Sequence, residues 1–115
     1  MVDLADEDQL HAATGVSGSA PAYLYAFVEA LEAAGVAAGL TARQSADLAR
    51  ATVAGAAALM AQSGEDPAAL RKQVTSPNGT TQAALEVLTK DGALETLLTD
   101  TVAACVKRSK ELAGS

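Results

Sequence analysis

The stretch VTSPNGTT, residues 74–81, gathers residue types that could bind an anion. A glycine lets a ligand approach the backbone closely, and hydroxyl side chains add hydrogen-bond donors. The residues that offer these groups are Ser76, Gly79, Thr80 and Thr81. An apolar helical pattern follows, and the first N–H groups of a helix lack intrahelical partners and carry the positive end of its dipole. Such a junction suits a carboxylate or a phosphate.

The same residues also make an ordinary turn between two helices. Pro77 fixes one backbone angle and disfavours a helical conformation at the residue before it, and Asn78 tolerates a left-handed turn. The stretch contains no histidine or carboxylate that could act as a general base. Spacing alone therefore leaves two interpretations open, a structural turn and an anion-binding loop.

Other candidates for chemistry along the chain are few. His11 is the single histidine and Cys105 the single cysteine, so no Cys/His cluster predicts a metal site or a disulfide. We expect His11 on a helix surface or in a capping role, and Cys105 buried rather than reactive. Glu29 and Glu32 are expected on a solvated helix face. Neither a hydrolase triad nor a metal centre is supported.

Length, charge and composition narrow the classes of function. A chain of 115 residues predicts one domain, and a net charge of −6 argues against nucleic acid as a partner. No apolar run is long enough to span a membrane, and the acidic start MVDLADEDQL lacks the pattern of a signal peptide. With one cysteine as well, a cytoplasmic protein fits best.

Helix signals dominate the chain, and alternating β-branched runs are missing. Thr41 and Gln44 have the spacing of a capping box, and Asp66–Pro67 has the pattern of an N-cap and a first helical residue. Ser19 is expected to cap another helix that holds Pro21 in its first turn. We predict an all-α chain of about six helices, over roughly residues 6–13, 19–39, 41–62, 66–74, 80–90 and 93–112.

The apolar residues of these helices are mostly small. Half of the residues are hydrophobic, yet aromatic residues make up only 3% and tryptophan is absent. Burying alanine contributes little compared with about 1.5–3 kcal/mol for a large aliphatic or aromatic side chain. Small faces let helices approach closely, including helices of another chain, so the composition favours an oligomer.

Three stretches in the right order resemble the pyrroline-5-carboxylate reductases, the enzymes that make proline. The first signature of that family resembles residues 14–40, TGVSGSAPAYLYAFVEALEAAGVAAGL, and the second resembles residues 74–88, VTSPNGTTQAALEVL. The family's last helix is similar to residues 103–112, AACVKRSKEL. The chain departs at Ala20, where family members usually have glycine, and at Asn78, where they often do. Both replacements are mild.

The resemblance implies a two-domain enzyme. In that family an N-terminal dinucleotide-binding domain holds NADPH or NADH, and a C-terminal all-α domain interlocks with its counterpart in a homodimer, which can assemble further into decamers. Residues 1–115 resemble the C-terminal dimerisation and substrate domain only, because no GxGxxG fingerprint follows a strand. We therefore expect the dinucleotide-binding domain to be missing from this chain, and the chain alone to bind no cofactor and to be inactive.

The resemblance also implies roles for the loop. The complete enzyme would reduce 1-pyrroline-5-carboxylate to L-proline, with the substrate carboxylate held by Ser76 and by the backbone around Gly79, Thr80 and Thr81. Thr81 would offer its hydroxyl to the ring nitrogen. The alternative is a free-standing helical dimerisation or interaction module without enzymatic activity. A third option, the helical domain of another dehydrogenase, is disfavoured by the SPNGTT match.

Overall fold

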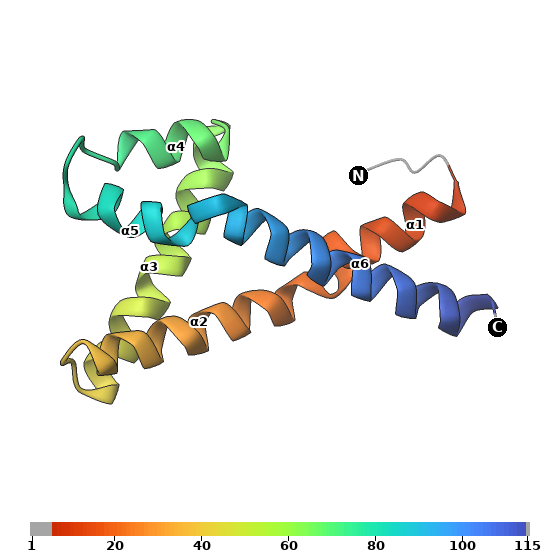
Figure 1. The fold of residues 1–115 in the computed structure, drawn as a ribbon, viewed down its shortest axis with the longest axis horizontal. Coiled ribbons are helices and arrows are strands. Elements are labelled where there is room, and N and C mark those ends of the chain that lie inside the picture. Colours follow the sequence, from red (N-terminus) through yellow and green to blue (C-terminus); the bar gives the residue numbers. More distant parts are fainter. Residues whose placement is uncertain (1–5, 115) are drawn as a thin grey trace. The chain divides into compact units, whose positions relative to one another are not determined.

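The computed structural model describes residues 6–114, and all regular structure in that range is helical (Figure 1). The helices of this range are α1 (Glu7–Ala13), α2 (Ala20–Ala37), α3 (Ala42–Ser63), α4 (Pro67–Gln73), α5 (Thr80–Leu88) and α6 (Ala93–Gly114). A π-helical turn, Thr14–Gly18, links α1 to α2, and a 3₁₀ turn, Lys90–Gly92, links α5 to α6. The prediction of an all-α chain with about six helices is confirmed. The ends of the predicted domain, residues 1–5 and 115, lie outside the described range.

The chain divides into two compact units, which are described separately below. One unit contains residues up to 24 together with residues from 86 onward, and the other contains residues 25–85. Two helices, α2 and α5, each contribute residues to both units.

In the first unit α1 and the π-helical turn pack on α6 (Figure 1). Gly15 is buried there, and a Cβ atom added to it would lie 2.8 Å from Cγ1 of Val102. A polar contact joins the two helices further along, with Nδ1 of His11 2.7 Å from Oγ of Ser109. This close packing requires a residue without a side chain at position 15.

The junction between α1 and α2 differs from the expected break. The amide of Ser19 donates to the carbonyl of Thr14 at 2.9 Å, five residues back, so the chain passes an extra residue through a π-turn and stays helical. Ser19 has helical backbone angles (φ −97°, ψ −14°), and its hydroxyl accepts a hydrogen bond from the thiol of Cys105 at 3.3 Å. As predicted, α2 begins directly after Ser19, whose carbonyl accepts from the amide of Ala22 at 3.2 Å, and Pro21 lies in its first turn. What differs is that the chain before Ser19 is helical.

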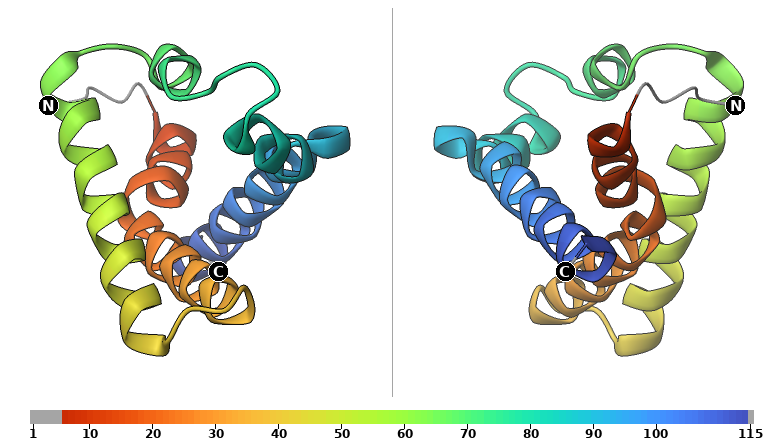
Figure 2. Two further views of the ribbon diagram at one scale, coloured as in Figure 1. Left: turned by 90° about the vertical axis from the view of Figure 1, so that its left-hand side faces the viewer. Right: turned by 90° about the vertical axis from the view of Figure 1, so that its right-hand side faces the viewer.

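In the second unit a tight turn over residues 38–41 joins α2 to α3 (Figure 2). Gly39 has φ +118°, a conformation that glycine adopts without steric cost. The capping box predicted at the start of α3 is present. The Thr41 hydroxyl accepts from the amide of Gln44, and the Gln44 side chain accepts from the amide of Thr41, both at 3.1 Å.

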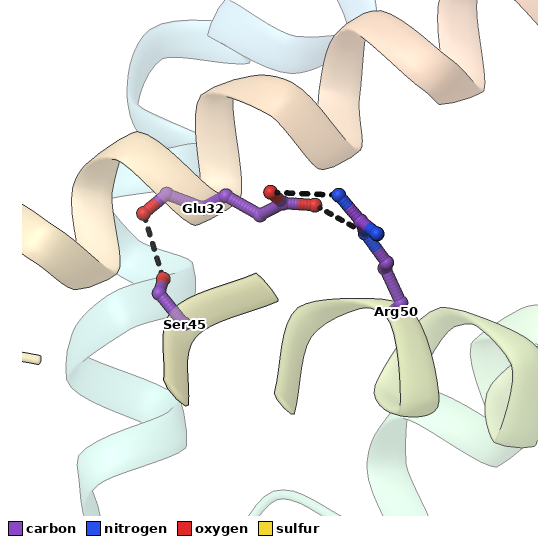
Figure 3. A network of polar contacts seen from close by, with 3 residues as sticks. All are labelled: Glu32, Ser45 and Arg50. Atoms are coloured by element: carbon purple, nitrogen blue, oxygen red, sulfur yellow. Dashed lines mark hydrogen bonds and ion pairs between the residues drawn. The ribbon is translucent and has the colours of Figure 1, made fainter. Parts of the chain in front are cut away.

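A small polar network fastens α3 to α2 (Figure 3). The hydroxyl of Ser45, a residue only 3% exposed, donates to the carbonyl of Glu32 at 2.7 Å. The Glu32 carboxylate accepts from Nε of Arg50 at 3.0 Å, and this contact raises the pKa of the guanidinium. Glu32 was expected on a solvated face. It is instead half-buried, because it pairs with Arg50 of the next helix, eighteen residues further along the chain.

Large apolar side chains are widely exposed in the described part of the chain. Ala49, 6% exposed, is the buried hydrophobic residue of this range, whereas Phe27 is 47% exposed and Leu97 63% exposed. Further exposed apolar side chains on the long helices are Leu24, Leu31, Leu48, Leu59, Met60, Leu98 and Leu112. None of the helices within residues 6–114 has the length and hydropathy needed to cross a membrane. The apolar faces thus lack the cover that a folded core normally gives them.

Candidate functional site

The loop between α4 and α5 is a tight β-turn. The amide of Gly79 donates to the carbonyl of Ser76 at 3.1 Å, which closes a four-residue turn with Pro77 at the second position. Asn78, at the third position, has φ +62°. Proline followed by a residue of positive φ is the pattern of a type II turn, and asparagine tolerates that conformation better than most residues. The backbone is therefore held in one defined shape.

This turn leads directly into α5. Ala83 donates the first intrahelical hydrogen bond to the carbonyl of Gly79 at 3.2 Å, so the amides of Thr80, Thr81 and Gln82 precede it. These amides form the positive end of the helix dipole. The side chains of Thr80 and Thr81 are both exposed. The N-terminal end of α5 thus offers backbone donors and two hydroxyls on the surface of the second unit.

The four residues predicted for the site meet at this junction. Ser76 and Gly79 are the two ends of the turn, and Thr80 and Thr81 are the first two residues of α5. A Cβ atom added to Gly79 would lie 3.2 Å from the carbonyl oxygen of Ser76, which is tighter than an ordinary contact. The absence of a side chain at Gly79 therefore helps the turn to close.

Gln82, which is not among the residues predicted for the site, lies at the same junction. Its side-chain oxygen accepts a hydrogen bond from the amide of Asn78 at 2.5 Å. Gln82 is the third residue of α5, the position from which glutamine completes a capping box. That position was a signal available in the sequence. The residue three positions before it, Gly79, has no hydroxyl, so the sequence does not match the usual capping box.

A shallow hollow of about 350 Å³ lies beside the turn, between α4 and α5. The residues that line it are Arg71, Lys72, Thr75, Pro77, Gln82 and Leu85. The two cations belong to the last turn of α4, where the negative end of the dipole favours them. They also place positive charge near the loop in a chain whose net charge is −6. The local electrostatics favour an anionic ligand.

The arrangement can bind an anion and donate a hydrogen bond, but it supplies no base of its own. Residues 74–82 contain no acid and no histidine. Within residues 6–114, no three His, Cys, Asp or Glu side chains come together as a metal-binding group. The groups of the junction are therefore suited to orienting a ligand and donating hydrogen bonds to it, and not to removing a proton from it.

Comparison with known proteins identifies the family. Residues 7–112 match the family described as pyrroline-5-carboxylate reductase dimerisation, and the chain belongs to that family. The pyrroline-5-carboxylate reductase of Arabidopsis thaliana is 46% identical over 111 residues, which is 96% of this chain and 40% of that protein. The expected resemblance is confirmed.

Solved structures agree with the sequence comparison. A pyrroline-5-carboxylate reductase from Coxiella burnetii is similar with a TM-score of 0.90 and 38% identity, covering 97% of this chain and 41% of that one. The Plasmodium falciparum pyrroline carboxylate reductase, solved with NADP bound, gives a TM-score of 0.88 at 30% identity, covering 99% and 43%. The present chain thus spans about two fifths of the length of these relatives.

Proposed function

We propose that this chain is the C-terminal dimerisation and substrate domain, residues 1–115, of a pyrroline-5-carboxylate reductase. The complete enzyme then reduces 1-pyrroline-5-carboxylate to L-proline with NADPH or NADH, a step of proline biosynthesis. The observation that carries this proposal is the SPNGTT turn, closed between Ser76 and Gly79 at the start of α5 inside the matched family region.

The substrate carboxylate fits the junction by charge and by donor chemistry. A carboxylate at a helix N-terminus accepts hydrogen bonds from unpaired amides and gains from the helix dipole. In the proposed complex the backbone around Gly79, Thr80 and Thr81 holds it, with the hydroxyl of Ser76 as a further donor.

Thr81 is the proposed partner of the substrate's ring nitrogen. Reduction of the C=N bond adds a hydride to its carbon, and the nitrogen gains a proton. The nicotinamide cofactor supplies the hydride, and the protein supplies orientation and electrostatics. The exposed Thr81 hydroxyl would donate a hydrogen bond to that nitrogen and hold it in place as its charge changes.

We assign the cofactor to the part of the relatives that this chain does not span. The Plasmodium falciparum relative has NADP bound, and the present chain covers 43% of it. On this view the 115-residue chain alone binds no cofactor and reduces nothing, and the complete enzyme works in the cytoplasm.

We further propose a homodimer, with larger assemblies such as decamers built from it. Exposed apolar side chains such as Leu24, Phe27 and Leu97 support this, because they need cover that the chain itself does not give. The family description, a dimerisation domain, supports a second copy of the chain as that cover.

Threonine variants in the complete polypeptide test the proposed chemistry. Thr81→Ala removes the hydroxyl, and we expect kcat to fall by about 10²-fold or more, the scale of a lost catalytic proton or hydrogen-bond donor. Thr81→Ser keeps the hydroxyl and should retain most of the activity. Thr80→Ala is the matched control on the neighbouring exposed hydroxyl and should change kcat far less.

Circular dichroism of each variant checks that folding is intact. Wild-type turnover by Thr81→Ala would remove the role given to Thr81. A complete polypeptide that forms a dimer but has no reductase activity would favour the free-standing interaction module.

A further inference from the structure

We propose that Gln82 is a positioning residue, which holds the turn before α5 in the shape that presents the amides of Thr80 and Thr81 to the substrate carboxylate. This inference rests on the proposed function. Gln82 would contribute to substrate binding indirectly, because its side chain holds the backbone of Asn78 in place.

The hydrogen bond between Gln82 and Asn78 connects the helix to the turn that precedes it. The side-chain oxygen of Gln82 accepts from the amide of Asn78, and Gln82 is half-buried at the edge of the hollow between α4 and α5. A residue in the first turn of α5 thereby fixes the backbone that enters α5. The link is local, since the two residues are four apart.

The backbone at Asn78 needs such a restraint. Its φ of +62° lies in the left-handed region, which every residue except glycine adopts at some energetic cost. If the turn relaxed to an ordinary right-handed conformation, the peptide planes that follow would rotate. The amides of Thr80 and Thr81 would then no longer be presented as they are now.

Comparison with α3 explains why the glutamine reaches this particular amide. At the start of α3 the side chain of Gln44 accepts from the amide of Thr41, the N-cap residue of that helix. At the start of α5 the corresponding amide is that of Gly79, which already donates to Ser76. Gln82 therefore accepts from the preceding amide, and its hydrogen bond holds the turn as well as the helix end.

Gln82→Met in the complete polypeptide tests the proposal, because methionine keeps the length and helix propensity and removes the oxygen acceptor. We expect amide hydrogen exchange of Asn78 and Gly79, whose amides donate the hydrogen bonds of this turn, to speed up by about three- to tenfold, the range of one net hydrogen bond. We expect KM for 1-pyrroline-5-carboxylate to rise by a similar factor, with kcat changed less than about twofold, because ground-state binding is what is lost.

Two variants serve as controls. Gln44→Met removes the equivalent hydrogen bond at the start of α3 and should leave both the exchange of Asn78 and Gly79 and KM unchanged. Gln82→Glu keeps an oxygen acceptor and should restore slow exchange. Since glutamate adds a negative charge beside the anion site, that variant is measured by exchange alone.

The outcomes separate this proposal from the proposed function. Unchanged exchange in Gln82→Met would show that the hydrogen bond does not hold the turn, and faster exchange with unchanged KM would show that the held turn does not serve binding. Either result overturns the role of Gln82 while the reductase assignment stands. A wild-type protein without turnover overturns the proposed function, and the role of Gln82 in substrate binding falls with it.

Discussion

Gly35 of α2 lies against Ser45 of α3, and adding one methyl group there is expected to destabilise the protein. A Cβ atom at position 35 would collide with the hydroxyl of Ser45 and lie 3.2 Å from its Cβ. That hydroxyl is buried and donates to the carbonyl of Glu32. Gly35→Ala therefore cannot be accommodated without moving Ser45 and weakening its hydrogen bond.

The magnitude follows from three contributions. Overpacking of a close contact costs about 1–3 kcal/mol, and a buried hydroxyl that loses its partner costs about 1–3 kcal/mol. Replacing glycine by alanine inside a helix returns about 0.5–1 kcal/mol. Because the first two contributions partly overlap, we expect Gly35→Ala to lower the free energy of unfolding by about 2 kcal/mol.

The sharpest form of this test is a double-mutant cycle with Ser45→Ala. That variant alone should cost about 1 kcal/mol for the lost hydrogen bond. In its background the colliding oxygen is gone, but the 3.2 Å contact with the Cβ of residue 45 remains, so Gly35→Ala should cost no more than about 1 kcal/mol. Urea unfolding followed by circular dichroism gives all four values, at one fixed protein concentration because association shifts apparent stability. If Gly35→Ala cost the same in both backgrounds within about 0.5 kcal/mol, the contact would not be the cause.

Two further predictions use the first unit and the exposed faces. Gly15→Ala should destabilise by about 1–3 kcal/mol in urea unfolding, because its Cβ would lie 2.8 Å from Cγ1 of Val102. Gly18→Ala in the same turn meets nothing closer than 3.7 Å and should be within about 0.5 kcal/mol of wild type; equal costs at both positions would refute the packing argument. Sedimentation across a wide concentration range should find a tight dimer or a larger closed assembly, given the exposure of Phe27 and Leu97. A stably folded monomer would contradict the dimerisation proposal.

Local signals in the sequence predicted most of the fold. The capping box at Thr41 and Gln44 predicted the start of α3 because both of its hydrogen bonds join residues three apart. Asp66–Pro67 also predicted the start of α4, because proline is favoured at the first helical position. The Asp66 side chain itself makes no capping hydrogen bond. The SPNG turn was also predictable, since proline and asparagine restrict the backbone wherever they occur.

Contacts between distant residues could not be predicted in this way. The π-turn at Thr14–Gly18 depends on packing between Gly15 and Val102, which lie far apart in the chain. The pairing of Glu32 with Arg50 likewise requires α2 and α3 to lie together, so a residue assigned to a solvated face became half-buried. For the site, residue types predicted the junction, whereas Gln82 was missed because Gly79, the residue before α5, has no side chain to complete a capping box.

The measurement that tests the central claim most directly is the conversion of 1-pyrroline-5-carboxylate to proline by the complete polypeptide. It is followed by oxidation of NADPH and, separately, of NADH, with proline identified as the product. We predict turnover with at least one of the two cofactors and none with the 115-residue chain alone. A folded, dimeric complete polypeptide that produces no proline with either cofactor would contradict it.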